Sequence, residues 1–185
     1  LSPTGSGEPW NNLHNTVAGQ RDAWLDTANP LARTMLLEWA DGAAGLTASH
    51  DDEQRQAMLR TEHGGLNEVF ADVYLISGED RYLGLARRFS HRAILTPLLN
   101  GEDRLTGLHA NTQIPKVIGF ERIAQLGGPE EWQEDWHQAA RFFWDTVVNR
   151  RSVAIGGNSV REHFHQVDDF SPMIAEIEGP ETCNT

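Results

Sequence analysis

Four hydrogen-bonding side chains lie within five positions near the middle of the sequence: His109, Asn111, Thr112 and Gln113. They come directly before Ile114-Pro115 and an apolar run. Proline suits the first turn of a helix, because it has no N–H and its φ is already helical. Unpaired backbone N–H groups also gather at that turn. The stretch therefore predicts a floor for a small polar ligand at the start of a helix. The alternative is a polar capping loop.

Two further histidines occupy similar settings at a nearly constant interval. His14, His63 and His109 are separated by 49 and then 46 positions. This is about the length of a helical hairpin with its connections, so the interval indicates a repeat. It predicts a fourth polar segment near residues 155–158, just before Glu162. Alternate helices would then start on one side of the molecule, where these four side chains would converge. The alternative for any single histidine is an ordinary surface or core residue.

The composition limits the classes of function. The 185 residues suffice for one domain with a substantial core, and 39% of them are hydrophobic. The formal net charge of −12 argues against nucleic-acid binding, which depends on clustered positive charge. No apolar run is long enough to span a membrane. We therefore expect neither nucleic acid nor a membrane as a partner. The single cysteine leaves the compartment undecided.

Hydrophobic periodicity predicts helices and no convincing strand. Apolar residues recur at helical spacing in the stretches 10–25, 32–43, 66–76, 82–93, 117–124 and 132–147. Together these stretches make three helical hairpins. An extended arm is expected at residues 1–9, a Gly-rich loop with a short strand at 153–164, and an irregular acidic segment at 167–180. The prediction is an all-α toroid of hairpins whose inner helices start at one mouth. A right-handed solenoid is the main alternative.

Several polar residues fall outside this phase and are expected to be structural. We expect surface positions for four histidines: His50, His91, His137 and His165. Glu68 and Asp72 lie one helical turn apart, and we expect both to be solvated. The six tryptophans suit either a helical core or sugar stacking, and the core is the commoner use.

Five segments, in this order, resemble one family, the β-L-arabinofuranosidase-type enzymes of glycoside hydrolase family 127. The resemblance runs from about His14 to the last residue. It is carried by Glu62-His63-Gly64-Gly65-Leu66-Asn67-Glu68, by the stretch from His109 to Lys116, by Phe142-Phe143-Trp144-Asp145, by the stretch from Ala154 to Phe164, and by Glu181-Thr182-Cys183-Asn184-Thr185.

The resemblance implies that residues 1–185 form a single, incomplete domain, the N-terminal part of an (α/α)6 catalytic barrel. Studied members resemble retaining exo-glycosidases that release L-arabinofuranose, with a zinc ion held by cysteines and a glutamate. By this resemblance Glu181 is both a zinc ligand and the general acid/base, and Cys183 is a zinc ligand. The nucleophile is a cysteine in a later motif. His14, His63, His109 and Glu162 correspond to residues that hold the sugar.

The chemistry suits these roles. Zinc favours thiolate and carboxylate ligands, and it lowers the pKa of a bound thiol. Imidazoles and carboxylates can hydrogen-bond the several hydroxyls of a furanose. We therefore expect part of a glycoside hydrolase acting on arabinose-containing glycans. By itself the chain should be inactive, bind zinc poorly, and associate with itself through exposed apolar helix faces.

Two alternatives remain open. A non-enzymatic helical-repeat module could use the same mouth to bind a carbohydrate or a peptide. The same toroid could also serve an enzyme with another substrate, such as a uronic-acid lyase, because fold alone does not decide function.

Overall fold

The computed structural model describes residues 9–127 and 130–175, and the side chains of residues 130–132 are not considered. Within these ranges the fold is all-α, as predicted, and the only β-pairing consists of isolated bridges. The helices are α1 (Pro9–Thr27), α2 (Pro30–Leu46), α3 (Asp52–Met58), α4 (Leu66–Ser77), α5 (Asp80–Arg88), α6 (Arg92–Leu99), α7 (Ala110–Leu126), α8 (Glu130–Arg150) and α9 (Ser171–Ala175). None of the described helices combines the length and the apolar composition that a membrane span requires.

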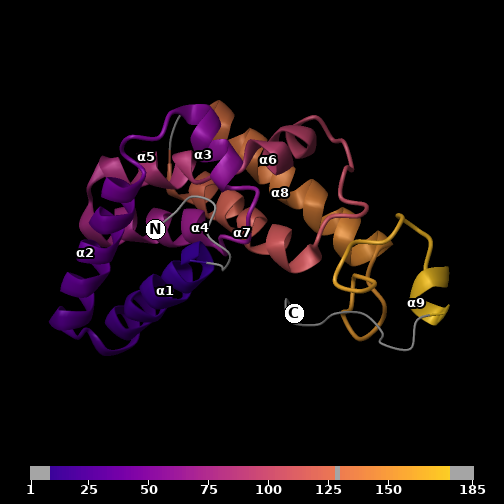
Figure 1. Ribbon diagram of the computed structural model, residues 1–185, viewed down its shortest axis with the longest axis horizontal. Helices are drawn as coiled ribbons and strands as arrows, with labels where there is room; N and C mark the ends of the chain where they lie inside the picture. Colours follow the sequence, from indigo (N-terminus) through magenta and orange to yellow (C-terminus); the bar gives the residue numbers. More distant parts are fainter. Residues whose placement is uncertain (1–8, 128–129, 176–185) are drawn as a thin grey trace.

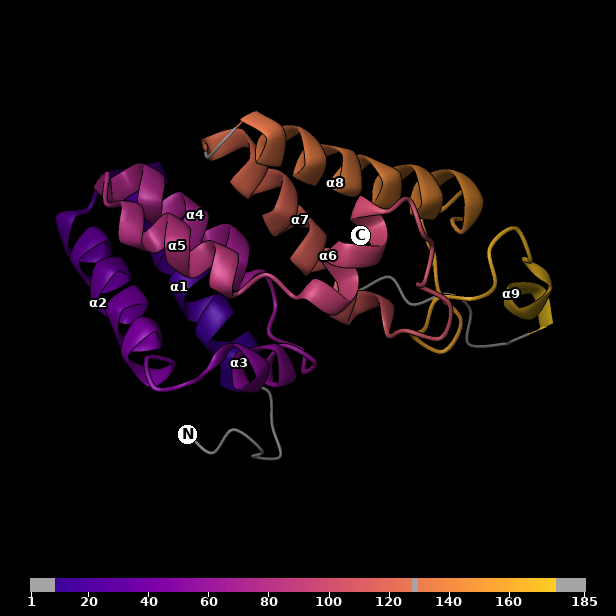
Figure 2. The same ribbon diagram turned by 90° about the horizontal axis from the view of Figure 1, so that it is seen from above.

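Three antiparallel helix pairs lie side by side: α1 with α2, α4 with α5, and α7 with α8 (Figures 1 and 2). The first helix of each pair forms a continuous row, because α4 packs against both α1 and α7. The short helices α3 and α6 lie in the connections between pairs. This arrangement is part of a helical toroid, and it confirms the predicted fold class.

Local sequence signals account for the helix ends. The side chain of Asn29 caps α2 and Pro30 occupies its first turn, as the break at these residues predicts. Gly78 adopts the left-handed conformation that ends α4. Residues 1–8, most of the expected arm, lie outside the described residues, and α1 begins at Pro9.

Three details of the predicted helices were wrong. Two short helices were missed: α9, within the segment 167–180 that was expected to be irregular, and α3, although Asp51 and Gln54 form a capping box at its start. The stretch 82–93 is two helices, α5 and α6, and α6 continues to Leu99 with Pro97 inside it. Pro115 does not start α7, because the helix begins at Ala110 and includes the proline.

The buried apolar side chains form two clusters. One joins α1, α2, α4 and α5, with Phe70 and Phe89 in edge-to-face contact at 5.0 Å between ring centroids. The other joins α6, α7 and α8. Phe164 belongs to this second cluster and contacts Phe143 of α8, with 6.2 Å between ring centroids. The loop that follows α8 is therefore anchored in the core.

Several polar residues expected at the surface are buried instead. Asp72 of α4 accepts hydrogen bonds from Arg21 of α1 at 2.8 Å and from Arg122 of α7 at 2.6 Å, so it ties the three adjacent helices together. Glu68 also pairs with Arg21, at 3.0 Å. Buried carboxylates need such partners to offset the loss of solvation.

Two histidines were also misplaced by the sequence analysis. His91 and His165 are buried, and each has polar partners in the interior that offset the loss of solvation. His91 contacts Lys116, and the ring nitrogens of His165 lie 2.8 Å from the carbonyl oxygens of Arg151 and Gln166.

The close approach of α4 and α7 depends on Gly119. A Cβ atom at Gly119 would lie 2.2 Å from the side chain of Asn67, so only glycine fits without a shift. The Asn67 amide donates a hydrogen bond of 2.8 Å to the carbonyl oxygen of Lys116. A fully buried asparagine thus links the two helices.

We predict that Gly119→Ala lowers the free energy of unfolding by about 2–3 kcal/mol, because the new methyl group overlaps Asn67. The control is Gly42→Ala in α2, where a Cβ meets nothing within 4 Å. It should stabilise the chain by about 0.5–1 kcal/mol through helix propensity. Urea denaturation measures both changes, and equal effects of the two substitutions would contradict the close-contact explanation.

Candidate functional site

The connection that leads to α4 lies between the first turn of α7 and His14 of α1, and we call this region the mouth. Asn111, in the first turn of α7, donates a 2.9 Å hydrogen bond to Glu62, in the connection that leads to α4. The same connection packs against α1, because the backbone at Gly64 and Gly65 touches His14. The histidine-bearing segments therefore share one side of the molecule.

His14 rests directly on the two glycines. A Cβ at Gly64 would lie 2.5 Å from Nδ1 of His14, and a Cβ at Gly65 would lie 3.1 Å from its Nε2. Gly64 also has a φ of +62°, a conformation that suits glycine. Burial and the nearby Arg21 guanidinium lower the pKa of His14, which favours the neutral imidazole.

His109 is the N-cap of α7, and its capping bond fixes its tautomer. The backbone N–H of Thr112 donates to Nδ1 of His109 at 3.3 Å. Since Nδ1 accepts, the proton of the neutral ring is on Nε2. Nε2 lies 3.6 Å from a carboxylate oxygen of Glu162. A donor and an acceptor therefore face each other across the mouth.

Glu162 reaches the mouth through a tight hairpin. Val160 and His163 exchange backbone hydrogen bonds of 2.8 and 3.1 Å, which leaves Arg161 and Glu162 as a two-residue turn. Both turn residues have positive φ, +48° and +66°, as a type I′ hairpin requires. Neither is the Asn or Gly that this turn prefers, so the backbone is strained where the carboxylate is presented.

The same hairpin completes the start of α7. The carbonyl oxygen of Glu162 accepts a 2.8 Å hydrogen bond from the N–H of Ala110, one of the N–H groups that the helix itself leaves unpaired. Phe164 and Leu108 pair in the same antiparallel arrangement, at 2.9 Å. The pairing in this loop consists of isolated bridges, in place of the short strand that was expected there.

Arg151 holds both sides of this pairing in place. Its side chain is fully buried at the end of α8. It donates to Asp103 at 2.6 Å and to Thr106 at 3.2 Å, in the segment that leads to His109. It also donates to the carbonyl oxygen of His165, just after the hairpin. One buried cation thus fixes the segments that carry His109 and Glu162.

His163 is a residue of this site that the sequence analysis did not assign. Its ring lies edge-on against His109, with 5.3 Å between ring centroids. The only feature of the sequence that could have identified His163 is its position next to Glu162. A two-residue turn places both its central residues and their neighbours at the same edge, so His163 follows Glu162 to the mouth.

His63 lies beneath the mouth. Its side chain is fully buried, and neither ring nitrogen has a hydrogen-bond partner among the described residues. Burial, followed by the charges of Lys116 and His91, lowers the pKa of His63 well below its usual 6.5. His63 is therefore a neutral imidazole in the floor.

Lys116 and His91 flank His63 in the interior. Burial lowers the pKa of Lys116 to about 7, although Glu62 opposes the shift. Burial and the Lys116 charge lower the pKa of His91 to about 3. The floor of the mouth thus combines three titratable groups whose charged forms are all disfavoured.

The residues implied as metal ligands and acid/base, Glu181 and Cys183, lie outside the described residues. Within the described ranges, no group of three His, Cys, Asp or Glu side chains could hold a metal ion. A closed zinc site needs four ligands and a catalytic one at least three. The described residues therefore do not fit a zinc site by themselves.

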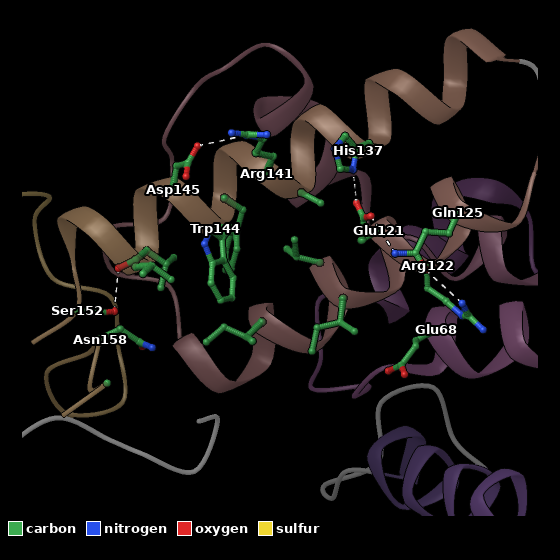
Figure 3. A pocket seen from close by; sticks show the side chains of 18 of the residues that line it. Glu68, Glu121, Arg122, Gln125, His137, Arg141, Trp144, Asp145, Ser152 and Asn158 are labelled. Atoms are coloured by element: carbon green, nitrogen blue, oxygen red, sulfur yellow. Dashed lines mark hydrogen bonds and ion pairs between the residues drawn. The ribbon is translucent and has the colours of Figure 1, made fainter. Parts of the chain in front are cut away.

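An open apolar groove of about 1110 Å³ runs between α7 and α8 (Figure 3). Trp144 of α8 points into it and is 64% exposed, and Ile118 of α7 and Val148 of α8 are also exposed. Polar pairs line the rim, and Nδ1 of His137 lies 2.8 Å from a carboxylate oxygen of Glu121. This groove is the exposed helix face that the sequence analysis expected.

A comparison with protein families settles the relationship. The model for the catalytic domain of β-L-arabinofuranosidase, GH127, matches residues 3–185. The chain belongs to glycoside hydrolase family 127. A comparison with curated proteins finds no match. The segments that define the mouth all fall within the part of this GH127 domain that the structure describes.

We predict that replacing Arg161-Glu162 with Asn-Gly raises the free energy of unfolding of the GH127 chain by about 1–2 kcal/mol. Asn and Gly adopt positive φ without the strain that Arg and Glu incur. Thermal and urea denaturation measure the change. Unchanged or lower stability would show that the hairpin is not strained.

The low pKa of Lys116 predicts a pH-dependent stability. Between pH 7 and about 10.5 the unfolded chain binds a proton at Lys116 that the folded chain has lost. The free energy of unfolding therefore rises with pH in this window, by up to about 1.4 kcal/mol per pH unit from this group. Lys116→Met should remove that part of the slope. Arg141→Met, at a side chain that is 73% exposed, is the control and should keep it. Equal slopes for wild type and Lys116→Met would contradict the assignment.

Proposed function

We propose that this chain forms the sugar-binding part of a glycoside hydrolase domain that acts on L-arabinofuranosides. The family membership supports a glycoside hydrolase. The single observation that carries the proposal for the site is the 3.6 Å approach of His109 Nε2 and Glu162 at the mouth of the helix row.

In this proposal each polar side chain has a distinct task toward the sugar. His109 donates from Nε2 to a ring hydroxyl, and the exposed carboxylate of Glu162 accepts from a neighbouring hydroxyl. His14 contributes a second neutral imidazole from α1. His63 lies in the floor beneath them. Such contacts orient the substrate, and those that strengthen in the transition state accelerate the reaction.

The bond-breaking chemistry belongs to other residues. We propose Glu181 as general acid/base and zinc ligand, Cys183 as a zinc ligand, and a cysteine in a later motif as the nucleophile of a retaining mechanism. Zinc would be ligated by thiolate and carboxylate groups, and it would lower the pKa of a bound thiol. The described residues bind and orient the sugar in this scheme, and the chain by itself should be inactive and bind zinc weakly.

A second candidate function is a carbohydrate- or peptide-binding module without catalysis. The polar mouth and the open groove beside Trp144 are the two surfaces that would serve it. The two functions differ in one outcome, which is whether a bound arabinofuranoside is cleaved by the protein that carries the complete domain.

We also propose that the chain associates with itself through the apolar face of α7 and α8. Exposed Trp144, Ile118 and Val148 form a contiguous apolar surface there, and contiguous surfaces of this kind usually mark contacts with other protein segments.

We predict that His109→Asn and Glu162→Gln each lower kcat/KM for a nitrophenyl L-arabinofuranoside by about 100-fold in the full-length protein. Asn still caps α7, and Gln keeps the backbone bond to Ala110, so both variants should retain the fold and lose only the sugar contact.

The control is His137→Gln, which removes an exposed imidazole from the rim of the groove and should leave kcat/KM unchanged. Wild-type activity in both mouth variants would exclude the proposed sugar site. Arabinofuranoside binding without any hydrolysis by the full-length protein would favour the module.

A further inference from the structure

A buried cluster of Lys116, His91 and His63 lies under the mouth, and all three side chains are at most 5% exposed. Nζ of Lys116 donates to the carbonyl oxygen of Leu59 at 2.9 Å and lies 3.2 Å from Nδ1 of His91. Lys116 is the only lysine in the sequence. A buried ammonium is costly, so its retention calls for a specific use.

The contacts of Lys116 clamp the segment that carries His63. Leu59 is the C-cap of α3, and its carbonyl oxygen is the point from which the chain leads to His63. A second bond, from Asn111 to Glu62, holds the same segment. Both donors belong to α7, so the helix fixes the residues before His63 at two places. Deleting the ammonium would release one of them.

The surroundings of the cluster disfavour a positive charge on Lys116 less than on either imidazole. The ionisable groups that act on His63, Lys116 and His91 come from α1, from the segments beside α3 and α6, and from the cluster itself: His14, Arg60, Glu62, His63, His91 and Lys116. Only Glu62 is an acid, and it favours the charge on Lys116. Each imidazole is disfavoured as a cation by burial and by the ammonium. Because His91 accepts from Lys116 at Nδ1, its own proton is on Nε2.

We propose that Lys116 is a positioning residue of the sugar site: its ammonium holds the His63 segment against α7 through Leu59, lies against Nδ1 of His91, and adds its charge to the effect of burial in keeping both imidazoles neutral. A neutral imidazole can donate and accept, as a sugar hydroxyl requires, whereas a cation can only donate. The role of Lys116 toward a sugar rests on the proposed function, whereas its effect on the protonation of His63 and His91 does not.

The test is the titration of the histidine rings in the 185-residue chain, followed by the ¹⁵N chemical shifts of the imidazole nitrogens. His63→Gln and His91→Gln assign the two signals. In the wild type, both rings should stay neutral from about pH 7, below which Lys116 is protonated, down to about pH 5.5. In Lys116→Met, the protonation midpoint of at least one of them should rise by about one pH unit.

Two variants separate the charge from the packing. Lys116→Arg retains a positive charge and should keep both rings neutral, as in the wild type. Arg141→Met removes an exposed charge from α8 and should change neither midpoint. If Lys116 only supported the packing, the protonation midpoints of the two rings would be the same in Lys116→Met and Lys116→Arg.

Unchanged midpoints in a folded Lys116→Met variant would overturn the proposal. If that variant does not fold, the wild type and Lys116→Arg still decide, because a charged ring in either at about pH 6.5 would also overturn it. The titration needs no sugar. A full-length protein that fails to bind arabinofuranosides would therefore refute the proposed function and leave this result unaffected.

Discussion

The close packing of α4 against α7 is the constraint on which the mouth depends. Gly119 removes the side chain that would hold the helices apart, and Asn67 fills the space and bonds to the backbone of α7. Because the first turn of α4 lies against residues 116–119 of α7, the connection before α4 runs alongside the first turn of α7. The hydrogen bond from Asn111 to Glu62 joins this connection to the start of α7.

The residues at the mouth also complete the helix ends. His109 caps α7 with its side chain, and Glu162 accepts the N–H of Ala110 with its backbone. His109 caps the helix through Nδ1 and leaves Nε2 facing the mouth. Glu162 accepts through its backbone carbonyl oxygen and leaves its carboxylate facing the mouth. The strained turn at Arg161-Glu162 is the exception to local sequence preference. Such exceptions concentrate at functional sites, because the rest of the fold over-determines them.

The sequence predicted the elements that follow local rules. The helix row follows from apolar periodicity and from breaks such as Asn29-Pro30 and Gly78. The even spacing of the histidines predicted a common side for their segments, and their role toward a sugar stays a prediction. The burial of Asp72, His91 and His165 could not be predicted, because it depends on partners 14 to 51 positions away, such as Arg21, Lys116 and Arg151. Periodicity carries no information on such pairings. The roles of Glu181 and Cys183 rest on family resemblance, because both lie outside the described residues.

A crystal structure of the full-length protein with L-arabinose bound tests the account most directly. The account predicts the sugar at the mouth, with hydroxyl groups within hydrogen-bonding distance of Nε2 of His109 and the carboxylate of Glu162. A sugar bound only in the groove beside Trp144, with the mouth empty, would contradict it.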